Sequence, residues 1–348
     1  MNTSLRAGTL GLASLALVAG FGCGTSESGD GGDAVADISG DAAPDADVAT
    51  PRVFLDEYPL NAAFPEGGTY DSTEHAFYVG SLADGSVHRV DAATGEERTI
   101  FTPTEAGTWW TLGMAVDEAR RLLWVCAIDD QRGVSTDDPA YDGYVWVMDL
   151  ASGARVANYN LGETFATATC TDVALTADGT AYVTDREHAN VYKVAQGGAV
   201  TLFASDPALK GTLAGQNAAV VLPDASALMI VVYLDPALVR VDLADASVRK
   251  VALEGDFSDS DGLAAGADGM TWADGALFVA FSSKLFRVTP KDAAWTGATT
   301  AVAEVAEGMT DVVATPNGLY LLNGQAVRFA FNLETDPFRL ARFEGEFK

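Results

Sequence analysis

Residues 238–242 read Leu-Val-Arg-Val-Asp, and similar five-residue runs recur through most of the chain. Each run has the residue types and length of a short β-strand. Successive runs begin 42 to 58 residues apart. The runs are VHRVD at 87–91, VWVMD at 145–149, VYKVA at 191–195, LVRVD at 238–242, LFRVT at 285–289 and VRFAF at 327–331. Six copies at one approximate spacing indicate a repeat protein.

Each of these runs belongs to a larger unit. A more apolar run precedes each of them, at 76–80, 122–126, 181–184, 229–233, 277–280 and 319–322. A further run lies before each apolar run and opens at Glu66, Leu112, Thr171, Asn217, Asp268 and Thr310. A fourth run follows several of the units, for example at 97–101.

Four strands per unit at this period are typical of propeller blades, whereas a β-sandwich gives no reason for six copies. The sequence therefore predicts an all-β fold over residues 52–348, a six-bladed β-propeller with four antiparallel strands per blade. Two runs compete to close the ring by joining the last blade, residues 53–58 and residues 339–343.

The first 51 residues lack the repeat. In residues 1–23, Arg6 precedes an apolar stretch too short to span a membrane, which predicts an export signal. Cys23 ends it and resembles the lipidation site of a bacterial lipoprotein; the alternative is cleavage nearby with Cys23 incidental. Residues 24–51 carry seven acidic residues and no Lys or Arg, which predicts a disordered acidic tether. We expect an exported protein, either periplasmic or a lipoprotein on the outer membrane or cell surface.

The overall charge narrows the partners. With 21 Lys and Arg against 49 Asp and Glu, the net charge is −28, which argues against nucleic acid because phosphate binding needs a basic surface. Three cysteines are too few for a disulfide-dense scaffold. We expect a monomer that touches a membrane only through its N-terminal lipid anchor.

Polar residues open several of the innermost strands. The start of each such strand lies near the central channel of a propeller, so Glu66, Asn217 and Asp268 are expected to converge there. A buried carboxylate is costly unless it is paired or bound to a cation, and no Lys or Arg occupies an equivalent position. An all-oxygen set favours Ca²⁺, with Zn²⁺, Mg²⁺ and Mn²⁺ as further candidates. The alternative is that these side chains only cap strand ends through backbone groups and water.

A family resemblance sharpens this expectation. From about residue 53 to the end, the sequence is similar to the gluconolactonase and regucalcin (senescence marker protein) family of six-bladed propellers. The similarity is carried by Phe64-Pro65-Glu66-Gly67, Phe77-Tyr78-Val79-Gly80-Ser81, Asp172-Val173-Ala174, Gln216-Asn217 and Ala267-Asp268-Gly269-Met270.

The resemblance implies a divalent cation held by Glu66, Asn217 and Asp268 at the channel mouth. It further implies hydrolysis of a lactone or related ester, with Asp268 as the general base. Thr171, Asp172 and Asp311 are candidates for outer ligands or orienting groups around that cation.

The sequence also departs from the family pattern. Leu112-Gly113-Met114 stands where sugar lactonases of the family carry an Arg and an Asn for substrate hydroxyls, and Thr171 replaces the usual Asn. Trp109 and Trp110 lie just before that strand and would make the mouth more apolar. The substrate is then less polar than a sugar lactone. Alternatively, the chain is a non-catalytic cell-surface propeller with a structural channel metal, which binds a small ligand or a protein.

The remaining reactive residues give two weaker predictions. Cys126 and Cys170 are expected at the mouth side of neighbouring blades, either as a disulfide, which export allows, or as two buried thiols. The three histidines, His75, His88 and His188, fall in turns or strands away from the channel openings. They form no Ser-His-Asp set, so a hydrolase of this sequence would depend on its metal.

Overall fold

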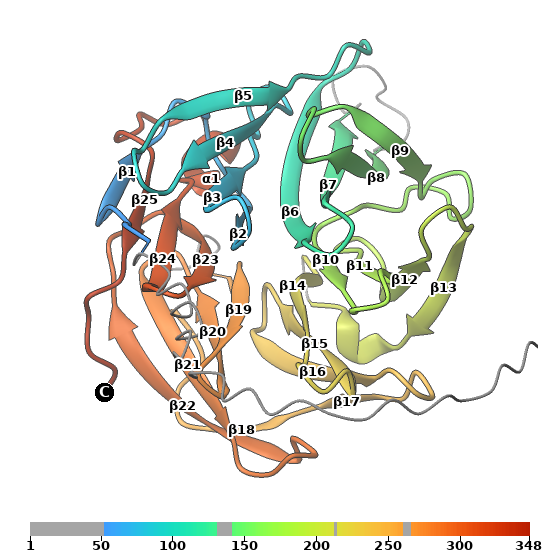
Figure 1. The fold of residues 1–348 in the computed structure, drawn as a ribbon. Helices are drawn as coiled ribbons and strands as arrows, with labels where there is room; N and C mark the ends of the chain where they lie inside the picture. Colours follow the sequence, from blue (N-terminus) through green and yellow to red (C-terminus); the bar gives the residue numbers. More distant parts are fainter. Residues whose placement is uncertain (1–51, 131–140, 212–213, 260–265) are drawn as a thin grey trace, which may run out of the picture. The chain divides into compact units, whose positions relative to one another are not determined.

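Six β-sheets surround a central axis in the part of the chain that the structure, a computed structural model, describes (Figure 1). The described residues are 52–130, 141–211, 214–259 and 266–348. The predictions of an export signal, of lipidation at Cys23 and of an acidic tether all fall on residues outside these ranges.

Blades 1 to 4 are meanders of four consecutive antiparallel strands. Blade 1 consists of β2 (Gly68–Asp71), β3 (Ala76–Val79), β4 (Val87–Asp91) and β5 (Glu97–Phe101). Blade 2 consists of β6 (Trp109–Asp117), β7 (Leu122–Asp130), β8 (Tyr141–Asp149) and β9 (Arg155–Asn160). Blade 3 consists of β10 (Val173–Leu175), β11 (Ala181–Thr184), β12 (Asn190–Val194) and β13 (Val200–Ser205). Blade 4 consists of β14 (Gln216–Val221), β15 (Ala227–Val232), β16 (Ala237–Asp242) and β17 (Val248–Lys250).

Blades 5 and 6 vary this plan. Blade 5 consists of β19 (Met270–Ala273), β20 (Ala276–Ala280), β21 (Lys284–Pro290) and β22 (Gly297–Glu304), and β18 (Ala252–Glu254) adds a parallel strand to its outer edge. Blade 6 consists of β23 (Met309–Thr315), β24 (Gly318–Asn323), β25 (Arg339–Arg342) and β1 (Glu57–Pro59). A short 3₁₀ helix, Pro207–Leu209, links blades 3 and 4.

The innermost strands form a closed ring. Strands β2, β6, β10, β14, β19 and β23 each contact the next, and β23 contacts β2. The predicted six-bladed propeller is therefore confirmed. Blades 3 and 6 stand half a turn apart in this ring, as do blades 1 and 4, and blades 2 and 5.

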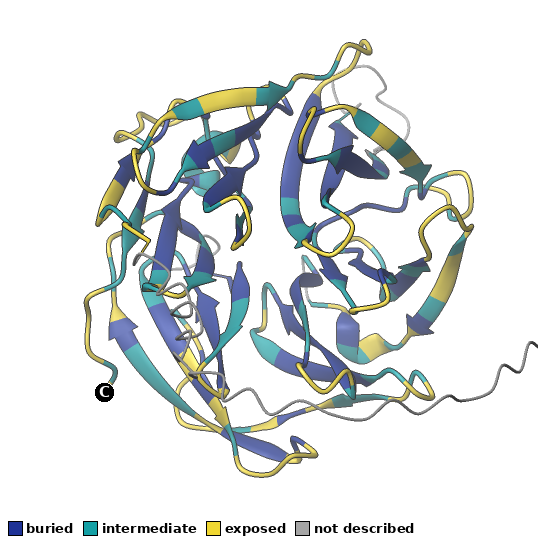
Figure 2. Cartoon of the chain, viewed as in Figure 1, coloured by how far each residue is buried: buried dark blue, intermediate teal, exposed yellow. Residues whose placement is uncertain are grey.

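Burial follows the position of a strand within its blade (Figure 2). The second strands β3, β11, β15 and β20 are buried along their whole length, because both faces of each sheet pack against neighbouring blades. Outer strands such as β9 and β13 contain both exposed and partly buried residues. This burial of both sheet faces explains why the second strands are recognisable in the sequence as continuous apolar runs.

Blade 6 joins the two ends of the propeller domain. Tyr58 of β1 lies opposite Leu340 of β25, and β25 in turn pairs with β24. The Tyr58 ring is fully buried against Phe77 and Tyr320, at 5.1 and 5.8 Å between ring centroids. Its hydroxyl donates to the carbonyl of Ala92 in blade 1 at 2.7 Å. Both of the predicted closing segments are thus used, one as the third strand and one as the outermost strand.

The predicted strand at 327–331 is wrong. These residues belong mostly to α1 (Ala326–Ala330), which lies in the connection between β24 and β25. Gln325, in the left-handed conformation with φ +55°, ends the extended backbone before the helix. A five-residue apolar run fits one helical turn as well as a strand, so its pattern could not decide between them. The described part of the chain has no helix long and apolar enough to cross a membrane.

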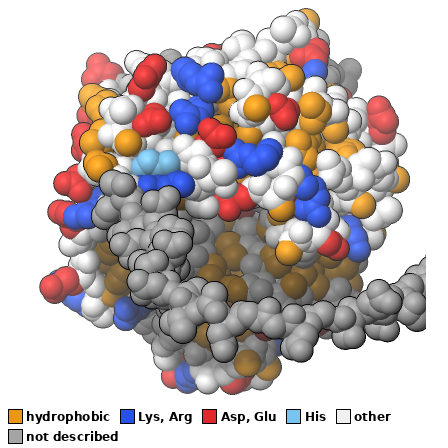
Figure 3. Space-filling view, in the orientation of Figure 1, with side chains coloured by type: hydrophobic (Ala, Val, Ile, Leu, Met, Phe, Trp, Pro, Cys, Tyr) orange, Lys and Arg blue, Asp and Glu red, His pale blue; other side chains and the backbone are white. Residues whose placement is uncertain are grey.

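Charges of both signs are scattered over the face drawn in Figure 3, with apolar side chains between them. Lys and Arg side chains thus lie among the Asp and Glu side chains on the described part of this face.

Candidate metal and ligand site

The inner strands surround a channel that is narrow in its middle. The narrow part has a volume of about 20 Å³ and opens on one side into a mouth cavity of about 340 Å³. The narrow part is lined by five of the six predicted strand-opening residues: Glu66, Thr171, Asn217, Asp268 and Thr310. The sixth, Leu112, lines the mouth cavity instead. The structure thus brings the predicted residues together from separate blades.

The predicted metal ligands lie at the junction of these two spaces. Glu66, Asn217 and Asp268 line both the narrow channel and the mouth cavity. Asn217 and Asp268 are 9% and 8% exposed, and the Asn217 side-chain amide donates to Asp268 Oδ1 at 2.6 Å. The backbone carbonyl of Asn217 accepts a hydrogen bond from Thr184 Oγ1 at 2.7 Å, which fixes this residue from the neighbouring blade.

Burial perturbs both carboxyl groups. It raises the pKa of Asp268 to about 7, although the Asn217 hydrogen bond and the positive charge of Arg186 oppose the shift. The pKa of Glu66 is raised well above its ordinary value, first by burial and then by the negative charges of Asp268, Asp311 and Asp172. A cation between the carboxylates would remove the cost of ionising them.

The donor set fits a hard divalent cation. Glu66 and Asp268 offer carboxylate oxygens, and Thr171 offers a hydroxyl in the same narrow section. Because the Asn217 amide nitrogen donates to Asp268, its amide oxygen is left as a possible ligand. Among the described residues, no three His, Cys, Asp or Glu side chains cluster closely enough to hold a metal. A site here would therefore take its further protein donors from the Asn217 amide and the Thr171 hydroxyl.

Asp172 and Asp311 make backbone contacts that orient the blades. Asp172 Oδ1 accepts from Val173 N and its Oδ2 from Ala219 N, both at 2.8 Å. Asp311 Oδ1 accepts from Val312 N at 2.7 Å, and its Oδ2 from Gly68 N at 2.8 Å. Each side chain therefore ties its own blade to the next one around the ring.

Two glycines make room for these ties. A Cβ atom on Gly113 would lie 2.0 Å from Asp172 Oδ1, and one on Gly269 would lie 2.0 Å from Asp311 Oδ1. Burial raises the pKa of Asp172 to about 7 against the effect of its backbone hydrogen bonds. Burial likewise raises the pKa of Asp311 well above its ordinary value. These contacts are those of orienting groups, and a role for either residue as an outer ligand stays a prediction.

The two tryptophans predicted at the mouth have side chains in different places. Both lie inside β6, because a register shift between Thr111 and Met114 lets that strand continue beyond the predicted start. Trp110 lines the mouth cavity. Trp109 packs against Trp146 and Tyr144, at 5.1 and 5.3 Å between ring centroids. Alternation along a strand turns successive side chains to opposite faces, so only Trp110 reaches the mouth.

Sequence reasoning missed Arg186 and Tyr233, which also line the cavity. They follow the second strands β11 and β15, whose ends point toward the mouth. The strand direction that placed Cys126 on the mouth side would have found them as well. Burial, together with the charges of Asp268 and Glu66, raises the pKa of Tyr233, so its phenol stays protonated and can donate.

A buried carboxylate holds the loop that carries Arg186. Asp185 accepts from Thr169 Oγ1 at 2.6 Å and from Tyr192 OH at 2.8 Å, and it pairs with His188 Nδ1 at 2.9 Å. The hydrogen bond to Asp185 raises the pKa of His188. His188 is thus part of the support of this loop, which agrees with its assignment outside the channel.

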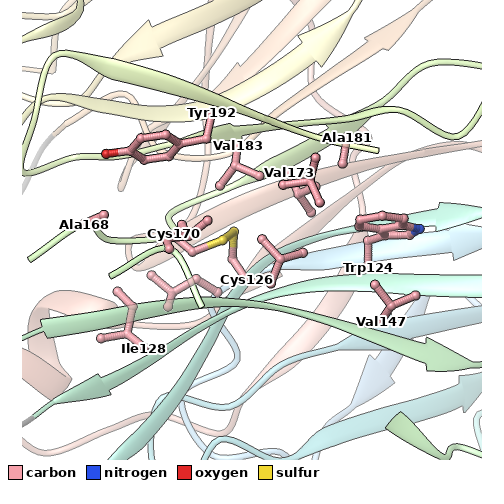
Figure 4. Packing of buried hydrophobic residues seen from close by; sticks show 14 of the residues in the cluster. Trp124, Cys126, Ile128, Val147, Ala168, Cys170, Val173, Ala181, Val183 and Tyr192 are labelled. Carbon is pink, nitrogen blue, oxygen red and sulfur yellow. A yellow bond between two sulfur atoms is a disulfide. The ribbon is translucent and has the colours of Figure 1, made fainter. Parts of the chain in front are cut away.

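Cys126 and Cys170 form a disulfide between blade 2 and the segment that leads into blade 3 (Figure 4). Their Cα atoms are 5.0 Å apart, and both residues are fully buried. Figure 4 shows the sulfur bridge among apolar side chains that include Ile128, Val173 and Tyr192. The covalent link lies in the wall between two blades.

Comparison with known proteins supports the architecture. No family model and no curated protein matches the sequence. Solved structures do match. The fold is that of the six-bladed propellers.

Three of these similar structures cover most of both chains. The major allergen Mala s 1 of Malassezia sympodialis aligns with a TM-score of 0.66 at 17% identity, over 83% of this chain and 96% of its own. The calcium-binding protein regucalcin from Agrobacterium tumefaciens aligns with a TM-score of 0.54 at 17% identity, over 85% and 95%. A gluconolactonase from Xanthomonas campestris aligns with a TM-score of 0.55 at 16% identity, over 82% and 87%. At these identities the likeness shows the fold alone.

Proposed function

We propose that the protein is a metal-dependent hydrolase of a lactone or related carboxylic ester. The observation that carries the proposal is the convergence of Glu66, Asn217 and Asp268 at the floor of the mouth cavity. The neighbours described above, a calcium-binding regucalcin and a gluconolactonase, support this choice among propeller functions. Glu66, Asn217 and Asp268 would hold the cation, with Ca²⁺ as the first candidate. When bound, it would polarise the ester carbonyl and acidify water.

Asp268 is the proposed general base. Its carboxyl group lies in the cavity floor, where it can accept a proton from a water molecule held beside the substrate. It accepts a proton from the attacking water as the water oxygen bonds to the carbonyl carbon. The ester C–O bond then breaks and the leaving oxygen takes that proton, which gives a hydroxy acid from a lactone. The Asn217 amide holds Asp268 in position, and Arg186 and Tyr233 lie where they can donate to substrate oxygens.

The deciding experiment compares the full chain with its Asp268→Asn variant. We expect hydrolysis of at least one member of a lactone and ester panel in the presence of Ca²⁺, followed by acid release at constant pH. Asp268→Asn should lower kcat by about 10²-fold or more, because proton transfer by a positioned base contributes that much. Asp245→Asn, an exposed turn variant, is the matched control and should keep full activity.

Two outcomes would count against the hydrolase. Equal turnover in Asp268→Asn and the parent chain would remove Asp268 from the reaction. Binding of calcium and of a ligand with no turnover of any ester would instead support the non-catalytic surface propeller. That alternative is favoured by Leu112, which is apolar where sugar lactonases of the family bind substrate hydroxyls.

We also propose that the protein is exported and anchored through Cys23. The buried Cys126–Cys170 disulfide supports export, since such bonds persist in oxidising compartments. Cys23→Ser should move the protein from the membrane fraction to the soluble fraction, whereas a fully soluble parent chain would contradict the anchor.

A further inference from the structure

The mouth cavity has an apolar wall that contains a helix, α1, where the sequence predicted a strand. Helix α1 and the residue after it contribute Ala326, Val327, Phe329, Ala330 and Phe331 to this wall. Leu82, Trp110 and Leu112 extend it from blades 1 and 2. The segments of blades 3 to 5 contribute polar groups to the cavity, namely Arg186, Glu187, Gln216, Asn217, Tyr233 and Asp268, and Glu66 of blade 1 lies beside the apolar wall.

The apolar wall is a built feature of blade 6. The Gln325 side chain is 2% exposed. It donates to Asp336 O at 2.9 Å and accepts from Asp336 N at 3.0 Å. These two hydrogen bonds link the start and the end of the connection that contains α1. Arg328 pairs with Asp336 at 3.2 Å. These contacts anchor α1 independently of any ligand.

Aromatic packing fixes the face of α1 that looks into the cavity. Phe329 lies edge-on to Trp110 at 5.7 Å and contacts Phe64 at 5.1 Å, measured between ring centroids. Phe64 in turn contacts Phe338, just before β25, at 5.0 Å. The wall therefore joins blade 6 to blades 1 and 2 and stands next to the junction where Glu66 lies.

This wall is unsuited to a substrate covered with hydroxyl groups. Each hydroxyl facing it would lose its water without gaining a partner, which costs about tenfold or more in affinity. Phe331 is 65% exposed at the rim, and an apolar group lying over it would remove that surface from water. The apolar wall and the polar groups of the cavity thus complement a molecule with an oxygen-rich end and an apolar end.

We propose that the substrate carries an alkyl or aryl group beside its lactone or ester carbonyl, and that α1 with Trp110 forms the subsite for that group. This inference rests on the proposed hydrolase for the bond that is broken. The subsite itself is a binding property and can be measured without turnover.

The first test is a series of γ-lactones with alkyl chains of increasing length, compared with gluconolactone. Each added methylene should raise kcat/KM about fourfold until the cavity is filled, because burying one methylene contributes about that much. Val327→Ser and Phe331→Ser should flatten this dependence. The matched control is Leu333→Ser, because Leu333 is an apolar residue of similar exposure (56%, against 65% for Phe331) that does not line the cavity.

The second test is calorimetric binding of butanoate, hexanoate and octanoate to the full chain with Ca²⁺. Affinity should rise about fourfold per methylene in the parent and in Leu333→Ser, and it should not rise in Phe331→Ser. Phe331 is exposed, so this variant is expected to fold, and its melting temperature serves as the check. Chain-dependent binding without hydrolysis supports the subsite and overturns the hydrolase. Hydrolysis without chain dependence overturns the subsite and leaves the hydrolase standing, and absence of both overturns both.

Discussion

At the scale of single residues, the channel carboxylates make the protein sensitive to pH. A carboxyl group whose pKa is higher in the folded than in the unfolded state binds protons better when folded, so the free energy of unfolding falls as pH rises between the two values. For Asp172 and Asp268 this window runs from an ordinary value of about 4 to a folded value of about 7. The melting temperature of the metal-free protein should therefore fall between pH 4 and pH 7.

Calcium supplies the check on this pH prediction. Added Ca²⁺ should raise the melting temperature at pH 7 far more than at pH 4, because it compensates the ionised form. Asp178→Asn is the control, since the pKa of Asp178 is lowered to about 2 by hydrogen bonds from Thr176 and Thr180, and its charge does not change in this window. A melting temperature that rises from pH 4 to pH 7 without metal would contradict the shifts.

The glycines beside the orienting aspartates allow a second prediction at this scale. In Gly269→Ala the new methyl group would lie 2.0 Å from Asp311 Oδ1, so the Asp311 tie to Gly68 must shift. We expect a loss of about 1–3 kcal/mol in the free energy of unfolding, as for overpacking elsewhere. Urea denaturation measures it, and an unchanged midpoint would show that the channel wall relaxes freely.

At the scale of elements, the closing strand β1 can be tested through Tyr58. Tyr58→Ala removes a fully buried ring and should cost about 3–5 kcal/mol. Tyr58→Phe keeps the ring but loses the hydrogen bond to Ala92 O and the one from Leu55 N, and should cost about 1–2 kcal/mol. Urea denaturation of the two variants separates packing from hydrogen bonding. Similar small losses in both would mean that β1 contributes little to closing the ring.

The elements also show how far the sequence could lead. Second strands such as β15 and β20 were predictable because burial on both faces leaves continuous apolar runs. The convergence of Glu66, Asn217 and Asp268 was predictable because the innermost strand of each propeller blade begins near the channel. Arg186 and Tyr233 were missed although they follow second strands, whose direction brings the residues after them to the mouth. Helix α1 was missed because one helical turn and one short strand share the same apolar pattern.

At the scale of the whole molecule, the Cys126–Cys170 disulfide spans a sequence separation of 44 residues across two blades. Its removal should lower the free energy of unfolding by about 2–4 kcal/mol through the freedom that the unfolded chain regains. Thermal melting of the double variant Cys126→Ala/Cys170→Ala measures this. A reducing agent should lower the melting temperature of the parent but not of the double variant, and equal melting of the two oxidised proteins would contradict a stabilising role.

The orienting aspartates of the ring repeat with an approximate two-fold symmetry. The dipeptide Thr171-Asp172 in blade 3 recurs as Thr310-Asp311 in blade 6, half a turn away. In both halves the aspartate nests against a glycine of the preceding blade and accepts an amide of the following one. The same half-turn relates Leu112 to Asp268. The two-fold repeat therefore covers the orienting aspartates but not the residues that open blades 2 and 5, because Leu112 is apolar and Asp268 brings a carboxyl group to the cavity floor.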